Sequence, residues 1–84
     1  MITREKFDEI FETTESNWEG DNALTGLLII SKYIKDTVLV AAEHDCIYSV
    51  GVDELIAAGI TEEDVTTLRL NNWGGEDDTL YCFV

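Results

Sequence analysis

Residues 37–50 decide the fold class of this chain and read Thr-Val-Leu-Val-Ala-Ala-Glu-His-Asp-Cys-Ile-Tyr-Ser-Val. The two ends of the stretch, 37–41 and 46–50, are rich in β-branched and aromatic residues, which favour strands. The residues between them, 42–45, are predicted to form a hairpin loop. Neither run alternates cleanly between polar and apolar residues, as strands covered on one face do. We therefore expect two short strands in the centre of a small sheet.

A third strand is expected at the end of the chain. Residues 79–84 read Thr-Leu-Tyr-Cys-Phe-Val and follow a predicted turn over 74–78, Gly-Gly-Glu-Asp-Asp. A terminus this apolar is seldom left frayed. It should pair beside one of the two earlier strands and complete an antiparallel sheet of about three strands.

Four helices are predicted around these strands. Thr3 can cap the first, with Ile2 and Phe7 in the positions of a hydrophobic staple. A second helix begins near Asp21 or Asn22, ends near 35–36 and is apolar on most sides, so we expect it to be the buried central helix. Two short helices follow: one over 52–58 that ends at Gly59, and one capped by Thr61 that ends at 71–72. Trp18 and Trp73 should pack on the core. The predicted fold is one compact α+β domain over 1–84, with two longer and two short helices.

The net charge of the chain is unusually negative. Eighteen Asp and Glu against five Lys and Arg give a formal net charge of −13. Phosphate binding needs clustered Lys and Arg, so DNA, RNA and anionic lipid are excluded as direct ligands. The longest apolar run, 27–30, is far short of the roughly 20 residues that span a bilayer, and no secretory leader is visible. We expect a cytoplasmic protein with reduced thiols, away from membranes.

Catalytic and metal motifs are sparse. One His and two Cys without paired spacing predict no zinc site, and the chain has no glycine-rich phosphate motif, so no metal or cofactor is expected. His44, Asp45 and Cys46 form the one cluster that resembles a catalytic centre. Neighbouring strand residues point to opposite faces, so Asp45 and Cys46 should diverge. A small enzyme centred on His44 and Cys46 is therefore the third hypothesis, behind two kinds of binding protein.

Two stretches of the sequence carry a resemblance. The first is Gly20-Asp21-Asn22-Ala23-Leu24-Thr25-Gly26-Leu27 with Ile30, Lys32 and Tyr33, and the second is Gly59-Ile60-Thr61-Glu62-Glu63-Asp64-Val65 with Leu68, Asn72 and Trp73. Together with the closing Phe83-Val84, they resemble small acidic bacteriophage-encoded proteins of unknown function. The resemblance covers most of the chain beyond the first helix. It implies a phage context, and hence the host cytoplasm, in which such proteins often inhibit a host enzyme or defence complex.

The first functional hypothesis is therefore a non-enzymatic, acidic protein-binding module. It would be a phage accessory or anti-defence inhibitor that binds a basic surface on a nucleic-acid-handling host protein, with carboxylates that imitate phosphates. The alternative is that the acids form a solvated surface that only keeps the protein soluble. The rival hypothesis is a housekeeping adaptor, or a subunit of a larger assembly, that binds through an apolar surface. The acids expected at the interface are Asp21, Glu43, Asp45, Glu62, Glu63 and Asp64.

Overall fold

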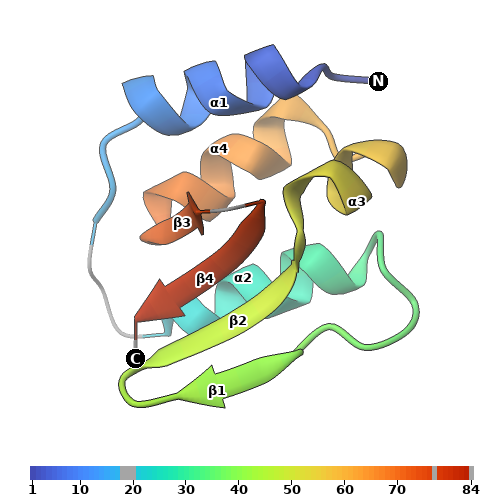
Figure 1. Cartoon of the computed structure of the whole chain (residues 1–84). Helices are drawn as coiled ribbons and strands as arrows, with labels where there is room; N and C mark the ends of the chain where they lie inside the picture. The colour runs from blue at the N-terminus through green and yellow to red at the C-terminus, as the bar shows by residue number, and fades with distance from the viewer. Residues whose placement is uncertain (18–20, 77, 84) are drawn as a thin grey trace.

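The computed structural model describes residues 1–17, 21–76 and 78–83 and confirms the α+β class. Four strands form one antiparallel sheet in the order β1-β2-β4-β3. In Figure 1, α2 lies behind this sheet and α1 and α4 are stacked above it. The elements are α1 (Arg4–Thr13), α2 (Asn22–Ser31), β1 (Ala41–Glu43), β2 (Cys46–Gly51), α3 (Val52–Ala57), α4 (Glu62–Leu70), β3 (Trp73–Glu76) and β4 (Thr79–Phe83).

The predicted caps at Thr3, Thr61 and Gly59 are confirmed by their hydrogen bonds, whereas the second helix ends at Ser31 and not near 35–36. The Thr3 hydroxyl accepts a bond from the Lys6 amide at 3.1 Å and so satisfies a free N–H of α1. Gly59 has a φ of 95°, a left-handed conformation that suits glycine. The Ile60 amide then donates to the Leu55 carbonyl at 3.2 Å, which completes a Schellman turn after α3.

The central helix is α4, and the prediction that the second helix would be central is wrong. α4 contacts α1, α2 and β3. α2 ends at Ser31, and its Leu24 and Leu28 are 55% and 60% exposed. α2 packs through a narrow face that includes Gly26, because the indole of Trp73 occupies the space beside this glycine. A Cβ on Gly26 would lie only 1.9 Å from Trp73 Nε1.

The first predicted strand is also placed wrongly. β1 covers Ala41–Glu43 and not 37–41, and the turn to β2 has two residues, the first of them His44 with a φ of 54°. The predicted loop 42–45 was therefore too long. Before β1, the hydroxyl of Ser49 donates to the Val38 carbonyl at 2.6 Å. A side chain thus binds a carbonyl that a longer strand would have paired with a backbone N–H.

The predicted turn over 74–78 is in part a fourth strand. β3 pairs with β4, with Gly74 opposite Tyr81, so the sheet has four strands where about three were expected. Glycine is a poor strand former, but here it admits the Tyr81 ring, since a Cβ on Gly74 would lie 2.5 Å from Tyr81 Cζ. The last strand pairs beside β2 as predicted, with Tyr48 opposite Tyr81.

The core lies between the sheet and the helices. Trp73 is fully buried as predicted, whereas the prediction for Trp18 falls outside the described residues. α4 supplies Val65 and Leu68, and β4 supplies Leu80 and Cys82. The other fully buried large side chains are Phe7, Ile30, Val52, Leu55 and Ile60.

Candidate protein-binding surfaces

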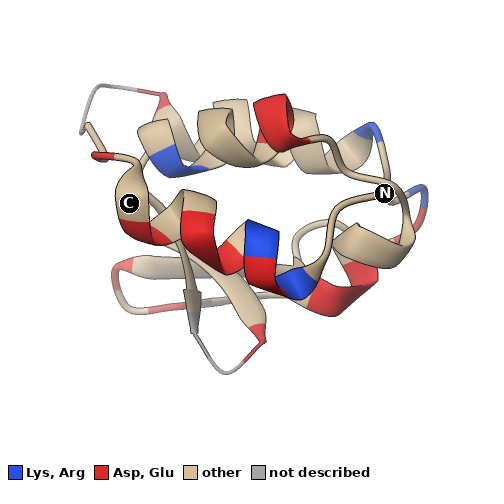
Figure 2. Ribbon diagram, turned by 90° about the horizontal axis from the view of Figure 1, so that it is seen from above, with Lys and Arg blue, Asp and Glu red and all other residues tan. Residues whose placement is uncertain are grey.

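An acidic stripe runs along the outer side of α1. Glu5, Asp8, Glu9 and Glu12 are all exposed, at the spacing i, i+3, i+4, i+7 that places them on one face of a helix. The opposite side of α1 buries Phe7 and Ile10. Figure 2, which looks down on α1, shows acidic segments along this helix and over α3. The amphipathic pattern that builds the core therefore also concentrates carboxylates on one outer surface.

The two bases on α1 are engaged by carboxylates. Arg4 Nη1 lies 3.0 Å from Asp53 Oδ1 and 2.8 Å from Asp78 Oδ1, and Arg4 Nε lies 3.1 Å from Asp8 Oδ1. The hydrogen bonds to Asp53 and Asp8 raise the pKa of Arg4. Exposed pairs of this kind contribute about 0–1 kcal/mol each, so their main effect is to join α1 to α3 and to the residue before β4.

Lys6 links the same stripe to α4. Lys6 Nζ lies 3.8 Å from Glu9 Oε1 and 3.7 Å from Glu62 Oε1. Glu62 is one of the six acids predicted at the interface, and Glu63 follows it in the exposed first turn of α4. We define the acidic face by the exposed carboxylates of α1 and those that Arg4 and Lys6 bind: Glu5, Asp8, Glu9, Glu12, Asp53, Glu62 and Asp78.

Asp64, the third predicted acid of α4, points inward. Its side chain is 16% exposed, and its Oδ2 lies 2.8 Å from Lys32 Nζ and accepts a hydrogen bond from the Tyr33 hydroxyl. Burial alone would raise the pKa of Asp64, but the hydrogen bonds from Lys32 and Tyr33 outweigh it and lower that pKa. This carboxylate holds the end of α2 to the start of α4, so it belongs to the scaffold.

The remaining predicted acids lie on other elements. Asp21 occupies the N-cap position of α2 and makes no side-chain capping bond, while Glu43 and Asp45 flank the tip of the β1–β2 hairpin. All three are exposed. The structure therefore divides the six predicted residues into the start of α4, the start of α2 and the hairpin. Sequence reasoning missed the stripe on α1 as a site, although its helical spacing was the signal.

A second surface is the face of the sheet turned away from the core. Residues directly paired across antiparallel strands point to the same side. The pairs Tyr48–Tyr81 and Cys46–Phe83 lie on the side opposite the core-facing Cys82. Phe83 is 52% exposed, and its ring packs edge-to-face on Tyr81 with centroids 5.7 Å apart. A solvated sheet face usually carries polar residues, so aromatic side chains here mark a possible contact surface.

Both thiols are free and buried, but the two cysteines differ in environment. Cys82 is fully buried in the core, and burial, followed by the nearby Cys46, raises the pKa of its thiol to about 11. Cys46 is 8% exposed and lies outside the core cluster. His44 is 89% exposed, with Nε2 3.8 Å from Glu43 Oε1. Among the described residues no group of three or more His, Cys, Asp or Glu could hold a metal ion.

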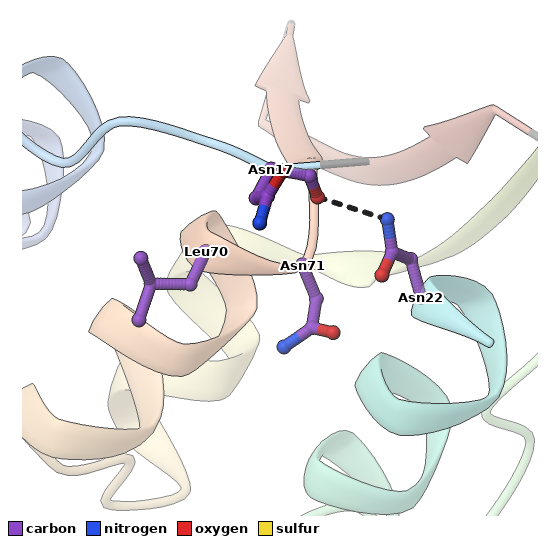
Figure 3. A pocket seen from close by; sticks show the side chains of 4 residues that line it. All are labelled: Asn17, Asn22, Leu70 and Asn71. Carbon is purple, nitrogen blue, oxygen red and sulfur yellow. Dashed lines mark hydrogen bonds between the residues drawn. The ribbon is translucent and has the colours of Figure 1, made fainter. Parts of the chain in front are cut away.

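A hollow of about 300 Å³ lies between the loop after α1, α2 and the end of α4. Its lining includes Asn17, Asn22, Leu70 and Asn71 (Figure 3). The amides there bind the protein itself: Asn22 Nδ2 donates to the Asn17 carbonyl at 3.0 Å, and Asn71 Nδ2 donates to the Thr67 carbonyl at 2.8 Å. The first bond joins α2 to the loop after α1 and the second caps the end of α4, which gives the polar lining a structural role.

Comparisons of the chain with protein families, with curated proteins and with solved structures gave no match. Among the described residues, no helix has the length and apolar character needed to cross a membrane.

Proposed function

We propose that this chain is a non-enzymatic protein-binding module that docks the acidic face on a basic surface of its partner. The observation that carries the proposal is the α1 stripe, whose four carboxylates are exposed while the neighbouring Arg4 and Lys6 are already paired. A surface of one sign attracts an oppositely charged partner and raises the rate of association. Of the predicted acids, Glu62 belongs to this face through its pair with Lys6, and Asp64 does not.

The spacing of the stripe supports imitation of a nucleic acid. From Glu5 to Glu12 the helix rises about 10.5 Å at about 1.5 Å per residue. The four carboxylates are separated along the axis by about 4.5, 1.5 and 4.5 Å, a mean of about 3.5 Å, which compares with one phosphate per about 3.4 Å along one DNA strand. The resemblance to small acidic phage proteins points the same way. The proposed partner is a host protein that handles nucleic acid, bound in the host cytoplasm.

The test is binding to bacterial lysate proteins with matched charge variants. Glu5→Gln with Glu12→Gln removes two charges of the stripe without touching the ion pairs of Arg4 and Lys6. Glu15→Gln with Asp36→Asn removes two exposed charges elsewhere and serves as the control. We expect the Glu5→Gln, Glu12→Gln variant to release the captured protein as the salt concentration rises, and the control variant to retain it. Added DNA should compete with the unaltered chain for the captured protein. Equal retention by both variants and no competition by DNA would refute the proposal.

A second candidate is the adaptor that binds through an apolar surface, and the aromatic sheet face favours it. Tyr81, which is half-buried, and Phe83, which is exposed, form an aromatic pair on that face. Aromatic side chains are enriched among the residues that dominate binding energy at interfaces. If this surface is the one used, Phe83→Ser should abolish capture, and capture by the unaltered protein should be the same at low and high salt.

A further inference from the structure

The edge of the sheet formed by β1 is open. β1 is the first strand in the order β1-β2-β4-β3, so its one hydrogen-bonded neighbour is β2. Figure 1 shows no other described element beyond it. Residues 39–45 are all exposed, and Leu39 and Val40 among them are 49% and 59% exposed. An edge strand offers a row of backbone N–H and C=O groups to another chain.

This edge has little protection beyond the three-residue length of β1. Natural edge strands are blunted by short length, by charged residues, lysine above all, by proline, by bulges or by a covering element. Residues 37–50 contain no Lys, Arg or Pro, and the two residues that begin β1 are the small Ala41 and Ala42. Small side chains leave the backbone accessible. The one charge within β1 is Glu43, which is exposed.

We propose that β1 accepts an extended basic segment of the partner protein as a fifth strand of the sheet. Backbone hydrogen bonds supply the affinity in strand addition, and alternate side chains supply the specificity. A Lys or Arg opposite Glu43 would form a favourable cross-strand pair, with Asp45 close by. A second copy of this chain would bring the same carboxylates and a net charge of −13, which disfavours it as the occupant. The inference rests on the proposed function for the sign of the partner's charge.

The experiment uses the whole chain and a short capped peptide that alternates lysine and valine. Backbone amide shifts and hydrogen exchange are recorded during the titration. We expect shifts at residues 39–43, and slower exchange at those of their amides that do not already donate to β2, as the Val40 amide does to the Tyr48 carbonyl. The same peptide N-methylated on every backbone nitrogen keeps its charge but has no N–H groups along its backbone, and it should leave these amides unchanged. Glu43→Lys should weaken binding of the first peptide several-fold, while Glu15→Lys, which makes the same charge change away from the edge, should leave it nearly unaltered.

Three results would overturn the inference. Equal binding of both peptides would show attraction by charge alone, without strand addition. Slow exchange at 39–43 in the free protein, together with a dimer in solution, would assign the edge to a second copy. Absence of any peptide effect on these amides would leave β1 as an unused edge. The proposed function fails separately, because it depends on Glu5 and Glu12, which lie on a different element.

Discussion

The two edge strands of the sheet, β3 and β1, differ in how far they are buried. β3 is covered: Trp73 is fully buried, and the strand contacts both α2 and α4. β1 has no residue that is even half-buried. Both strands are short and have a single hydrogen-bonded neighbour, so the sheet itself does not create the difference. The helices do, because they close one edge and leave the other to solvent or to a partner.

Local composition predicts the reverse of what is seen. The segment before β1 carries the branched, apolar Leu39 and Val40, which lie exposed, whereas β3 contains Gly74 and Gly75. Gly74 is nevertheless buried beneath the Tyr81 ring. Burial of an edge is therefore set by what packs against it, and strand propensity is a weak guide to that.

The largest loss of stability is expected when β4, the strand that connects the two halves of the sheet, is deleted. β4 lies between β2 and β3, so deleting residues 81–84 removes the pairs Tyr48–Tyr81 and Trp73–Cys82 that hold both sides together. Such a small domain has little core to spare. We expect the cooperative unfolding transition to disappear in a thermal melt followed by circular dichroism. A truncated chain with an unchanged melting temperature would contradict the central position of β4.

The next largest loss of stability is expected at β3, the edge strand that the helices cover. Trp73→Ala removes a fully buried indole whose Nε1 donates to the Asn22 carbonyl at 3.0 Å. Truncations of buried Phe or Trp typically cost about 3–5 kcal/mol of unfolding free energy. Val40→Ala, the matched truncation at the open edge, should cost within about 0.5 kcal/mol. Denaturant titration of both variants measures the contrast, and similar losses would show that β1 is covered after all.

Substitutions of Cys46 and Cys82 compare the two faces of the sheet at β2 and β4. Cys82→Ser places a hydroxyl in the core and should cost about 1–3 kcal/mol if that hydroxyl stays unpaired. Cys46→Ser should cost less, because Cys46 lies outside the core cluster. Alkylation of the native protein should be slower at Cys82, whose raised pKa of about 11 also leaves little thiolate at neutral pH. Faster labelling of Cys82 than of Cys46 would reverse the assignment of faces.

A substitution at Asp64 tests whether its contact with Lys32 and Tyr33 holds α2 in place over β3. Asp64→Asn should cost about 1 kcal/mol at pH 7, through the lost charge at the α4 N-terminus and the weakened pair. The folded-state pKa of Asp64 lies below its ordinary value of 3.8. Its stabilisation is therefore full above that value and declines as pH falls through the lowered pKa. Denaturant titrations should show the two proteins converging in strong acid, and a gap that is constant with pH would exclude the charge as the cause.

Much of the fold could be predicted because its signals are local. The caps at Thr3 and Thr61 and the Schellman turn at Gly59 depend on neighbouring residues, and all three lie where the sequence indicates. The errors concern long-range packing. Gly26 and Gly74 are each beside an aromatic ring from a distant segment, so no local rule shows that α2 packs by a glycine or that a glycine pair forms a strand.

The candidate site was predicted less well for the same reason. Asp64 is adjacent to two exposed acids in the sequence, yet Lys32 and Tyr33 from another helix engage it. The helical spacing of Glu5, Asp8, Glu9 and Glu12 is visible in the sequence. What the sequence could not show is that Arg4 and Lys6 bring α3 and α4 alongside, so that carboxylates from several elements share one surface.

The smallest effect on stability is expected at the open edge itself. Leu39→Ser replaces a side chain that is 49% exposed and does not pack against the core cluster, so the unfolding free energy should change by no more than about 0.5 kcal/mol, as at other surface positions. Its effect on binding of the lysine–valine peptide should be larger, because Leu39 borders the edge at which an added strand would pair. Denaturant titration measures the first quantity, and titration with the peptide measures the second. We expect equal stability and weaker peptide binding in the variant. A clear loss of stability would mean that residues 39–43 are packed within the fold, and the contrast between the two edges would then be lost.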